Sequence, residues 1–368
     1  MTVTNTKPLV IDAHQDIAWN MIAFERDYTR SFAETREIEK NSQVPQWNGD
    51  TLIGWDAYQE GRVAVVFSTL FSCPLRYKEG LWDIVCYGDN EQAHQQYRRQ
   101  LELYQRLAGD KPDHFRLLFS KDDLKDHLSN WGQAGPGEQQ PVGLVILMEG
   151  ADGVRAPQEA AQWWEWGVRI LGPAWAGTRY CGGTKEPGPL TKDGFALLDV
   201  MADTGMILDI SHMDEPAVLQ TLDYYPGRII ATHANPQALL KGKDSNRFLS
   251  DRVIQGLVER EAVIGVVPYN SFLNPEWVKG AGREMASLDN VVAHIDHICQ
   301  IAGSAKYTGI GTDADGGFGL QSVPVGYDSI ADLQKLGSLL IEKGYSEEDM
   351  ASILGGNWAQ VLEEALPE

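Results

Sequence analysis

Short apolar runs rich in β-branched residues recur along the chain, and amphipathic stretches of helical period separate them. Such runs are typical of buried strands, and their alternation with helices indicates a parallel sheet covered by crossover helices. We count eight runs, the number of strands that closes a (β/α)8 barrel of the TIM type. The predicted strands are residues 9–13, 63–70, 142–148, 168–171, 206–210, 229–232, 263–267 and 308–311.

The helical and loop signals complete this barrel. Helical periodicity is clearest at residues 90–107, 157–166, 198–204, 251–260, 288–302 and 330–343. Segments rich in glycine, proline and polar residues predict long loops near 128–141 and 181–194. Because the alternation resumes after each, we interpret residues 1–368 as a single α/β barrel domain. The run at 168–171 is the weakest, since Gly172 and Pro173 follow it, and the alternative is that no strand forms there.

The charge of the chain indicates which partners it avoids. The 52 acidic and 31 basic residues give a formal net charge of −21, which repels nucleic acid and anionic membrane surfaces. No stretch reaches the roughly 20 apolar residues that a spanning helix needs, and the first residues lack the regions of a signal peptide. We therefore expect a cytoplasmic protein with no nucleic-acid or membrane partner.

The four cysteines indicate a reduced protein. Cys73, Cys86, Cys181 and Cys299 are sparse for a chain of this length, and none stands in a CxxC spacing. This pattern argues against a disulfide scaffold and against a thiolate zinc site.

Metal-ligating residues follow five of the eight predicted strands, at the barrel end where active sites form. A lone histidine after a strand is more often structural than a ligand. Several histidines and carboxylates on one rim, however, are costly to bury unless they are paired or bind a metal. Neutral imidazole with carboxylate suits zinc or a similar ion, so a metal site is predicted. The residues are His14, Asp16, Glu149, Asp209, His212, His233, Asp313 and Asp315.

The remaining histidines do not follow strands, and no competing catalytic motif is present. His294 and His297 are three apart on one predicted helix, like a ligand pair, but packing is the favoured interpretation. Residues 313–316 lack the later ligands of a calcium loop. HExxH, GxSxG and phosphate-loop motifs are absent, so a hydrolase here uses water as its nucleophile. The other histidines are His94, His114 and His127.

The order and spacing of ten short motifs resemble the membrane (renal) dipeptidase family, peptidase family M19, whose members are amidohydrolase-like barrels with two zinc ions. The match covers almost the whole chain. The motifs are D-x-H-x-D at 12–16, Glu-Gly at 149–150, Gly-Val-Arg at 167–169, L-T-x-x-G at 190–194, Asp-Ile-Ser-His at 209–212, Thr-His at 232–233, R-x-L-S-D at 247–251, His-Ile-Asp-His-Ile at 294–298, Gly-Thr-Asp-Ala-Asp-Gly at 311–316 and Gly-Gly-Asn at 355–357.

The resemblance implies a set of metal ligands. His14 and Asp16 would hold one zinc ion, His212 and His233 a second, and Glu149 would bridge both, although other divalent metals are possible. Two ions joined in this way share a water that attacks a polarised carbonyl.

The resemblance also implies roles around the metals. Asp313 is similar to the acid/base residue that takes a proton from water and returns it to the leaving nitrogen; its alternative role is to orient a neighbour or to cap a helix. Arg247 would clamp the terminal carboxylate of the substrate, with a surface salt bridge as the alternative. Tyr269, after the seventh run, would face the substrate.

One position departs from the family pattern. Members commonly have a histidine a few residues after Gly-Val-Arg, to steady the oxyanion, and this chain has Trp175 there. An indole N–H donates one hydrogen bond but carries no charge, and losing an oxyanion donor costs about 3–4 kcal/mol. Trp175 would therefore weaken ordinary dipeptidase activity, or form an aromatic wall for a bulkier substrate.

We predict a binuclear zinc hydrolase that cleaves dipeptides or dipeptide-like small molecules, including L,D-dipeptides. The first alternative keeps the metals but acts on another amide, or on a biosynthetic substrate without hydrolysis. The second alternative is a non-catalytic barrel. The resemblance also implies a homodimer, and the final residues, VLEEALPE, offer no hydrophobic tail that a lipid anchor would replace.

Overall fold

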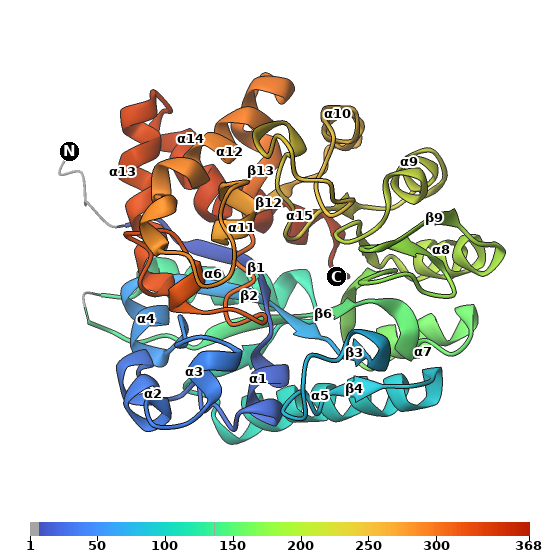
Figure 1. Cartoon of the computed structure of the whole chain (residues 1–368), viewed down its shortest axis with the longest axis horizontal. Coiled ribbons are helices and arrows are strands. Elements are labelled where there is room, and N and C mark those ends of the chain that lie inside the picture. Colours follow the sequence, from blue (N-terminus) through green and yellow to red (C-terminus); the bar gives the residue numbers. More distant parts are fainter. Residues whose placement is uncertain (1–6, 136) are drawn as a thin grey trace.

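The predicted strands form a parallel barrel in the computed structural model, which describes residues 7–135 and 137–368 (Figure 1). The order around the barrel is β11-β10-β7-β6-β2-β1-β13-β12. Its two ends meet at a parallel bridge between Ala231 and Ile264, where the Ala231 N–H donates to the Val263 carbonyl at 3.0 Å. The strands are β1 Val10–Gln15, β2 Val63–Leu70, β6 Val142–Glu149, β7 Val168–Gly172, β10 Ile207–Asp209, β11 Ile229–Ile230, β12 Ile264–Val266 and β13 Thr308–Ile310. The (β/α)8 prediction is therefore confirmed, including the doubtful strand at 168–171.

Helices surround this barrel, and each predicted helix is present, that at 288–302 with its predicted bounds and the others with shifted bounds (Figure 1). The stretch at 157–166 begins as a 3-10 turn and continues as α7. The bounds are α1 Ile17–Ala23, α2 Phe32–Glu39, α3 Val44–Trp47, α4 Trp55–Glu60, α5 Asn90–Asp110, α6 Lys121–Gln133, α7 Ala160–Glu165, α8 Lys192–Thr204, α9 Glu215–Tyr224, α10 Asp251–Glu259, α11 Asn270–Leu273, α12 Leu288–Ala302, α13 Gln334–Lys343, α14 Glu347–Ala351 and α15 Asn357–Ala365. None of them, in the part of the chain that the structure describes, is long and apolar enough to cross a membrane.

The segments predicted as long loops contain regular structure. Helix α6 extends to Gln133 because a Ser120–Asp123 capping box starts it and buried Leu124 and Trp131 anchor one face. The segment 181–194 holds an antiparallel hairpin of β8 (Cys181–Gly183) and β9 (Glu186–Leu190), followed by the start of α8. Glycine and proline were misleading here, because these residues also occur near helix ends and at strand edges.

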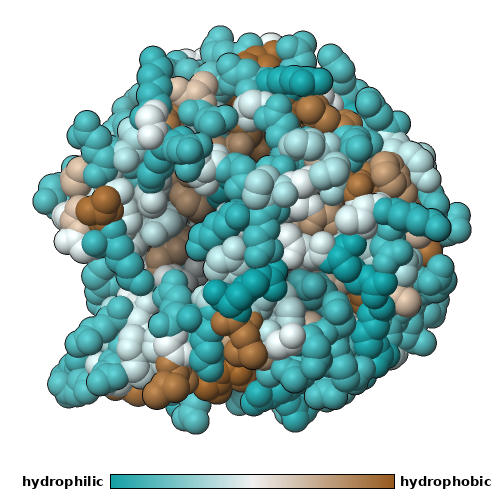
Figure 2. Space-filling view, turned by 45° about the vertical axis from the view of Figure 1, so that its right-hand side comes forward, coloured by the Kyte–Doolittle hydropathy of each residue, from teal (hydrophilic) through white to brown (hydrophobic). Residues whose placement is uncertain are grey.

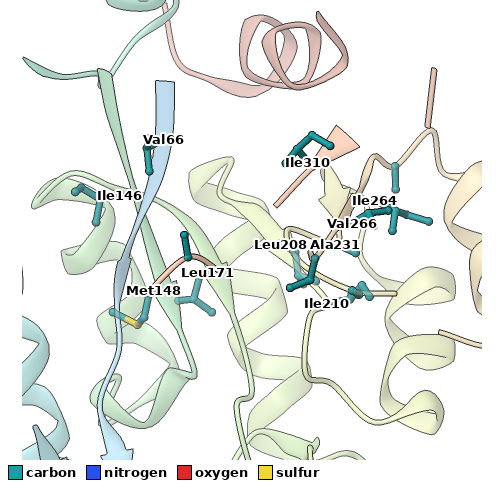
Figure 3. Close-up of a cluster of buried hydrophobic side chains, with 14 of the residues drawn as sticks. Val66, Ile146, Met148, Leu171, Leu208, Ile210, Ala231, Ile264, Val266 and Ile310 are labelled. Carbon is teal, nitrogen blue, oxygen red and sulfur yellow. The ribbon is translucent and has the colours of Figure 1, made fainter. Parts of the chain in front are cut away.

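Alternate residues along the strands enter two separate hydrophobic clusters. Ile146 and Met148 of β6 belong to one cluster, part of which is shown in Figure 3. This cluster also contains residues of the surrounding helices. Val145 and Leu147 belong to the other cluster, which joins residues of six barrel strands to Trp358 of α15 and to Leu124 and Trp131 of α6. Side chains that strands around a barrel share meet inside it, so this second cluster includes the barrel interior. The face in Figure 2 is mostly hydrophilic, with separate apolar patches.

The Gly-Gly-Asn motif near the C-terminus has a structural role. A Cβ on Gly355 would lie 2.6 Å from the Leu9 carbonyl oxygen, so only glycine allows this helical turn to approach the start of β1. Asn357 donates to the carbonyls of Ala305 and Thr308, both at 2.7 Å, and so fixes the start of β13. The motif positions two strands that carry site residues.

His294 on α12 predicts a pH dependence of stability. Its ring nitrogens are buried without hydrogen-bond partners, and burial lowers its pKa from 6.5 to about 4. Below pH 6.5 this histidine binds a proton in the unfolded chain but not in the folded protein, so the free energy of unfolding decreases as the pH is lowered. Between pH 7.5 and 5 the loss is about 2 kcal/mol. Urea unfolding at both pH values measures the free energy of unfolding of the wild type and of His294→Leu. The decrease between pH 7.5 and 5 should be smaller in the variant by this amount, and equal decreases would contradict the prediction.

Candidate metal centre

The Glu149 carboxylate at the end of β6 lies between imidazoles from three other strand ends. Its Oε2 is 3.6 Å from Nε2 of His14, which lies on β1. Its Oε1 is 3.0 Å from Nε2 of His212 and 3.3 Å from Nε2 of His233, the residues that follow β10 and β11. The two oxygens of one carboxylate therefore face two different groups of imidazoles.

Two further carboxylates complete the His14 side of the site. One ligand atom each of His14, Asp16 and Asp313 lies within 4.8 Å of the others, and the same holds for His14, Glu149 and His233. Nε2 of His14 is buried and has no hydrogen-bond partner. A buried ring nitrogen without a partner is costly, and a metal ion at this point would satisfy it. These residues fit a cation on both sides of Glu149.

Thr232 fixes which nitrogen of His233 faces the site. Asp209 accepts from the Thr232 hydroxyl at 2.5 Å and from the Thr232 N–H at 2.9 Å. Because a carboxylate only accepts, the Thr232 hydroxyl must donate its proton to Asp209. Its oxygen can then accept a hydrogen bond from the Nδ1–H of His233, 2.9 Å away. Nε2 of His233 then keeps its lone pair for a metal. Thr184 Oγ1 lies 2.9 Å from Nδ1 of His212 and is placed to act likewise.

The backbone at two site residues is left-handed. His212 has a φ of 68° and Asp313 a φ of 53°, a conformation that non-glycine residues seldom adopt. Asp313 is held there by its N–H, which donates to the His14 carbonyl at 3.1 Å. A Cβ on Gly316 would lie 2.1 Å from Oδ1 of Asp313, so glycine leaves room for that carboxylate. Strained positions of this kind are common at functional sites.

Burial and crowded carboxylates shift the pKa values of the site. Burial acts to lower the pKa of His14, but Glu149, Asp313 and Asp16 raise it to about 10. Burial, with Glu149 nearby, raises the pKa of Asp16 to about 6. Burial lowers the pKa of His212 to about 4, and the charge of Arg247 adds to this. Three carboxylates around one imidazole give the site a negative character that favours cations.

The residues expected to contact substrate lie at the edge of this centre. Arg247 is buried; its Nη2 donates to the His233 carbonyl at 2.6 Å, and its Nη1 has no partner. The Trp175 ring lies 6.1 Å from the His212 ring, centre to centre. Tyr269 stacks on Phe318 at 4.3 Å, and burial together with the Asp313 charge raises the pKa of Tyr269 to about 12.

Sequence reasoning missed three residues that build the site. Thr232 and Gly316 stand inside the motifs, but nothing in the sequence gave them a role beside their ligand neighbours. Thr184 stands in the segment predicted as a loop, and no sequence signal connects it to His212. The histidines interpreted as structural lie away from the centre: His127 Nε2 is 2.8 Å from the Ala64 carbonyl, and His94 Nδ1 is 3.0 Å from that of Gly153.

The chain matches a known protein family over almost its whole length. Residues 3–366 match the family model described as membrane dipeptidase, peptidase family M19. The chain belongs to this family. Membership confirms the predicted class of enzyme, a hydrolase that acts on peptide bonds, and implies that it depends on a metal.

Similar proteins come from bacteria and a yeast. The chain is 27% identical over 274 residues to an uncharacterised protein of the pqqA 5′ region of Klebsiella pneumoniae, over 72% of this chain and 94% of that protein. It is 26% identical to an uncharacterised dipeptidase of Schizosaccharomyces pombe, over 72% of this chain and 61% of that protein. The fold matches a metallopeptidase from Rhodobacter sphaeroides with a TM-score of 0.78, at 20% identity, over 98% of this chain and 100% of that one.

Thr232→Val tests the orientation of the histidines. The valine keeps the shape but removes the hydroxyl between Asp209 and His233, so zinc affinity should fall roughly 10- to 100-fold, as for other partners of metal-bound histidines. Competition with a chromophoric chelator measures the affinity, and Thr232→Ser, which retains the hydroxyl, should bind like the wild type. Unchanged zinc affinity in Thr232→Val would show that the hydroxyl does not determine the orientation of the His233 ring.

Proposed function

We propose that this family member is a binuclear zinc dipeptidase that cleaves the amide bond of dipeptides or dipeptide-like molecules, including L,D-dipeptides. The observation that carries the proposal is the placement of Glu149, one oxygen toward His14 and the other toward His212 and His233. A carboxylate in this position is suited to bridge two ions.

The proposed ligand sets are those that the family resemblance implies. His14 and Asp16 would hold one ion and His212 and His233 the other, with Glu149 shared; in support, Nε2 of His212 lies 2.9 Å from Nε2 of His233 and 3.0 Å from Oε1 of Glu149. Bound there, zinc would supply Lewis-acid chemistry, polarising the scissile carbonyl and making water more acidic. The choice of zinc rests on imidazoles combined with carboxylates, the donors that this ion takes in catalytic sites; His14 would give up its proton on binding the ion.

Asp313 is the residue best placed to move protons. Its Oδ1 lies 3.8 Å from Nε2 of His14, at the centre of the site, and burial raises its pKa well above the ordinary value. A carboxyl with a raised pKa can take a proton from the attacking water and still return it to the leaving nitrogen near neutral pH. Gly316 keeps the space beside this carboxylate open.

Arg247 is suited to bind the C-terminal carboxylate of the substrate. Its Nη1 is buried without a partner, while its Nη2 is fixed on the His233 carbonyl. A carboxylate would give this nitrogen a charge-assisted hydrogen bond. The Rhodobacter sphaeroides relative was solved with a phosphinate mimic of the dipeptide L-Ala-D-Ala, a small ligand of this class. Free dipeptides, rather than internal bonds of long chains, are therefore the proposed substrates.

Turnover of a dipeptide library with zinc-loaded protein tests the function. We expect hydrolysis of some pairs, including L,D pairs, with loss on chelation. Asp313→Asn should lower kcat by roughly 10² to 10⁴, the usual contribution of a general acid/base, and should keep its zinc because five other ligands remain. Full occupancy with no turnover of any pair in the wild type would overturn the proposal.

Trp175 favours a second candidate, a metal-dependent reaction on another amide or on a non-hydrolysed biosynthetic substrate. Its ring packs against those of Phe71 at 5.3 Å, Tyr77 at 5.9 Å and His212 at 6.1 Å, and so forms an aromatic wall beside the candidate metal centre. This wall suits a larger and more apolar group than a simple dipeptide carries.

Trp175→His separates the two candidates. If the wild type is a dipeptidase weakened at the oxyanion, the imidazole should raise kcat/KM on simple dipeptides by roughly tenfold or more, while Trp175→Phe should not. If the indole serves another substrate, neither change raises kcat/KM on simple dipeptides, and the account of Trp175 as a weakened oxyanion donor is wrong. Initial rates on one L,L pair and one L,D pair are sufficient for the comparison.

A further inference from the structure

Outside the barrel site, Cys73, Asp83 and Cys86 form a second cluster of metal-ligating side chains, in the connection between β2 and α5. Strand β3 (Cys73–Pro74) pairs in parallel with β4 (Cys86–Tyr87), and Cys73 is the register partner of Cys86. The two sulfur atoms and a carboxylate oxygen of Asp83 lie within 4.8 Å of one another. Residues at the two ends of one loop are thus brought to a single point.

The carboxylate of Asp83 in this cluster has an oxygen without a partner. The residue is only 3% exposed, and its Oδ1 is buried without a hydrogen-bond partner. A buried carboxylate oxygen without a partner is costly, and a cation is the partner that offsets this cost. A disulfide between Cys73 and Cys86 would leave the same oxygen unsatisfied, so the cluster favours a metal ion over a disulfide.

We propose that Cys73, Asp83 and Cys86 bind one soft divalent ion, such as Zn²⁺, in a structural site separate from the barrel centre. Two thiolates and a carboxylate are donors that zinc accepts, with water as the fourth ligand. Two sulfurs bound to one tetrahedral zinc are about 3.8 Å apart. The two cysteine sulfurs lie within 4.8 Å of each other, so small side-chain shifts suffice. Binding releases the two thiol protons to solvent, and Cys86, which is partly exposed, gives the ion access.

The ion would hold the loop between Cys73 and Cys86, here called the rim loop, against the mouth of the barrel. Tyr77 in the rim loop packs on Trp175, and Trp82 stacks on Trp47 of α3 at 5.7 Å with the planes 11° apart. Three large apolar side chains of the loop are exposed instead: Leu75, Leu81 and Ile84. A loop that buries few of its apolar residues gains stability when its ends are tied together.

Cadmium binding tests the site independently of the dipeptidase proposal, because the barrel ligands include no thiolate. Reduced, chelator-treated wild type titrated with Cd²⁺ should develop the ultraviolet charge-transfer band of cadmium thiolates, and the band should saturate, since Cd²⁺ taken up by the barrel centre adds nothing to it. The band should be lost in Cys73→Ser and in Cys86→Ser. Asp83→Asn should bind roughly tenfold more weakly or worse, since even an indirect partner of a metal ligand contributes that much.

The remaining cysteines provide matched controls. Cys181→Ser and Cys299→Ser should keep the band and its full amplitude, because these cysteines lie outside the cluster. Absence of a band in the wild type with four titratable thiols would overturn the proposal. So would isolation of the protein with a Cys73–Cys86 disulfide, shown by two free thiols after denaturation. Loss of dipeptide turnover alone does not bear on this site.

Limited trypsin digestion tests the effect on the rim loop. Arg76 and Lys78 are exposed within the loop, so cleavage after them reports how often it opens. Zinc should slow this cleavage several-fold in the wild type and leave the Cys73→Ser/Cys86→Ser double variant unchanged. Equal cleavage of the wild type with and without the ion would show that the ion does not hold the loop.

Discussion

The site depends on one carboxylate that several strand ends must reach at once. Glu149 lies within 3.6 Å of His14, His212 and His233, and these residues come from distant parts of the sequence. Only a closed parallel barrel presents all of their strand ends to the same point, so the Ala231–Ile264 bridge, which closes the barrel between the segments of β11 and β12, is also a condition for the metal centre.

Behind this carboxylate, a chain of hydrogen bonds transmits orientation from strand to strand. Asp209 of β10 fixes Thr232 beside β11, and Thr232 fixes the ring of His233. Asp12 of β1 likewise accepts from both the N–H and the hydroxyl of Thr312, at 2.7 and 2.6 Å, and so fixes the turn that carries Asp313. Buried acids that bind no metal are therefore as much a part of the centre as the ligands are.

The sequence was sufficient wherever local pattern decides structure. Apolar runs predicted the barrel strands, and strands of such a barrel end on the same rim. Of the polar residues that follow them, His14, Glu149 and His233 lie close together, whereas Asp315 pairs with Arg26. The sequence was not sufficient where two residues in contact are far apart along the chain. The contact of Thr184 with His212 depends on the β8–β9 hairpin, and the meeting of Cys73 with Cys86 depends on pairing of two-residue strands. The spacing argument against a thiolate site considered only neighbours in sequence.

The left-handed backbone at His212 and Asp313 places a limit on the stability of this protein. Each such residue costs of order 1 kcal/mol or more, and glycine would relieve most of it. The fold therefore carries a local strain that selection for stability alone would remove. A descendant freed from catalysis should exchange these two side chains early and become harder to unfold, so their retention in a related sequence is a mark of continuing chemistry.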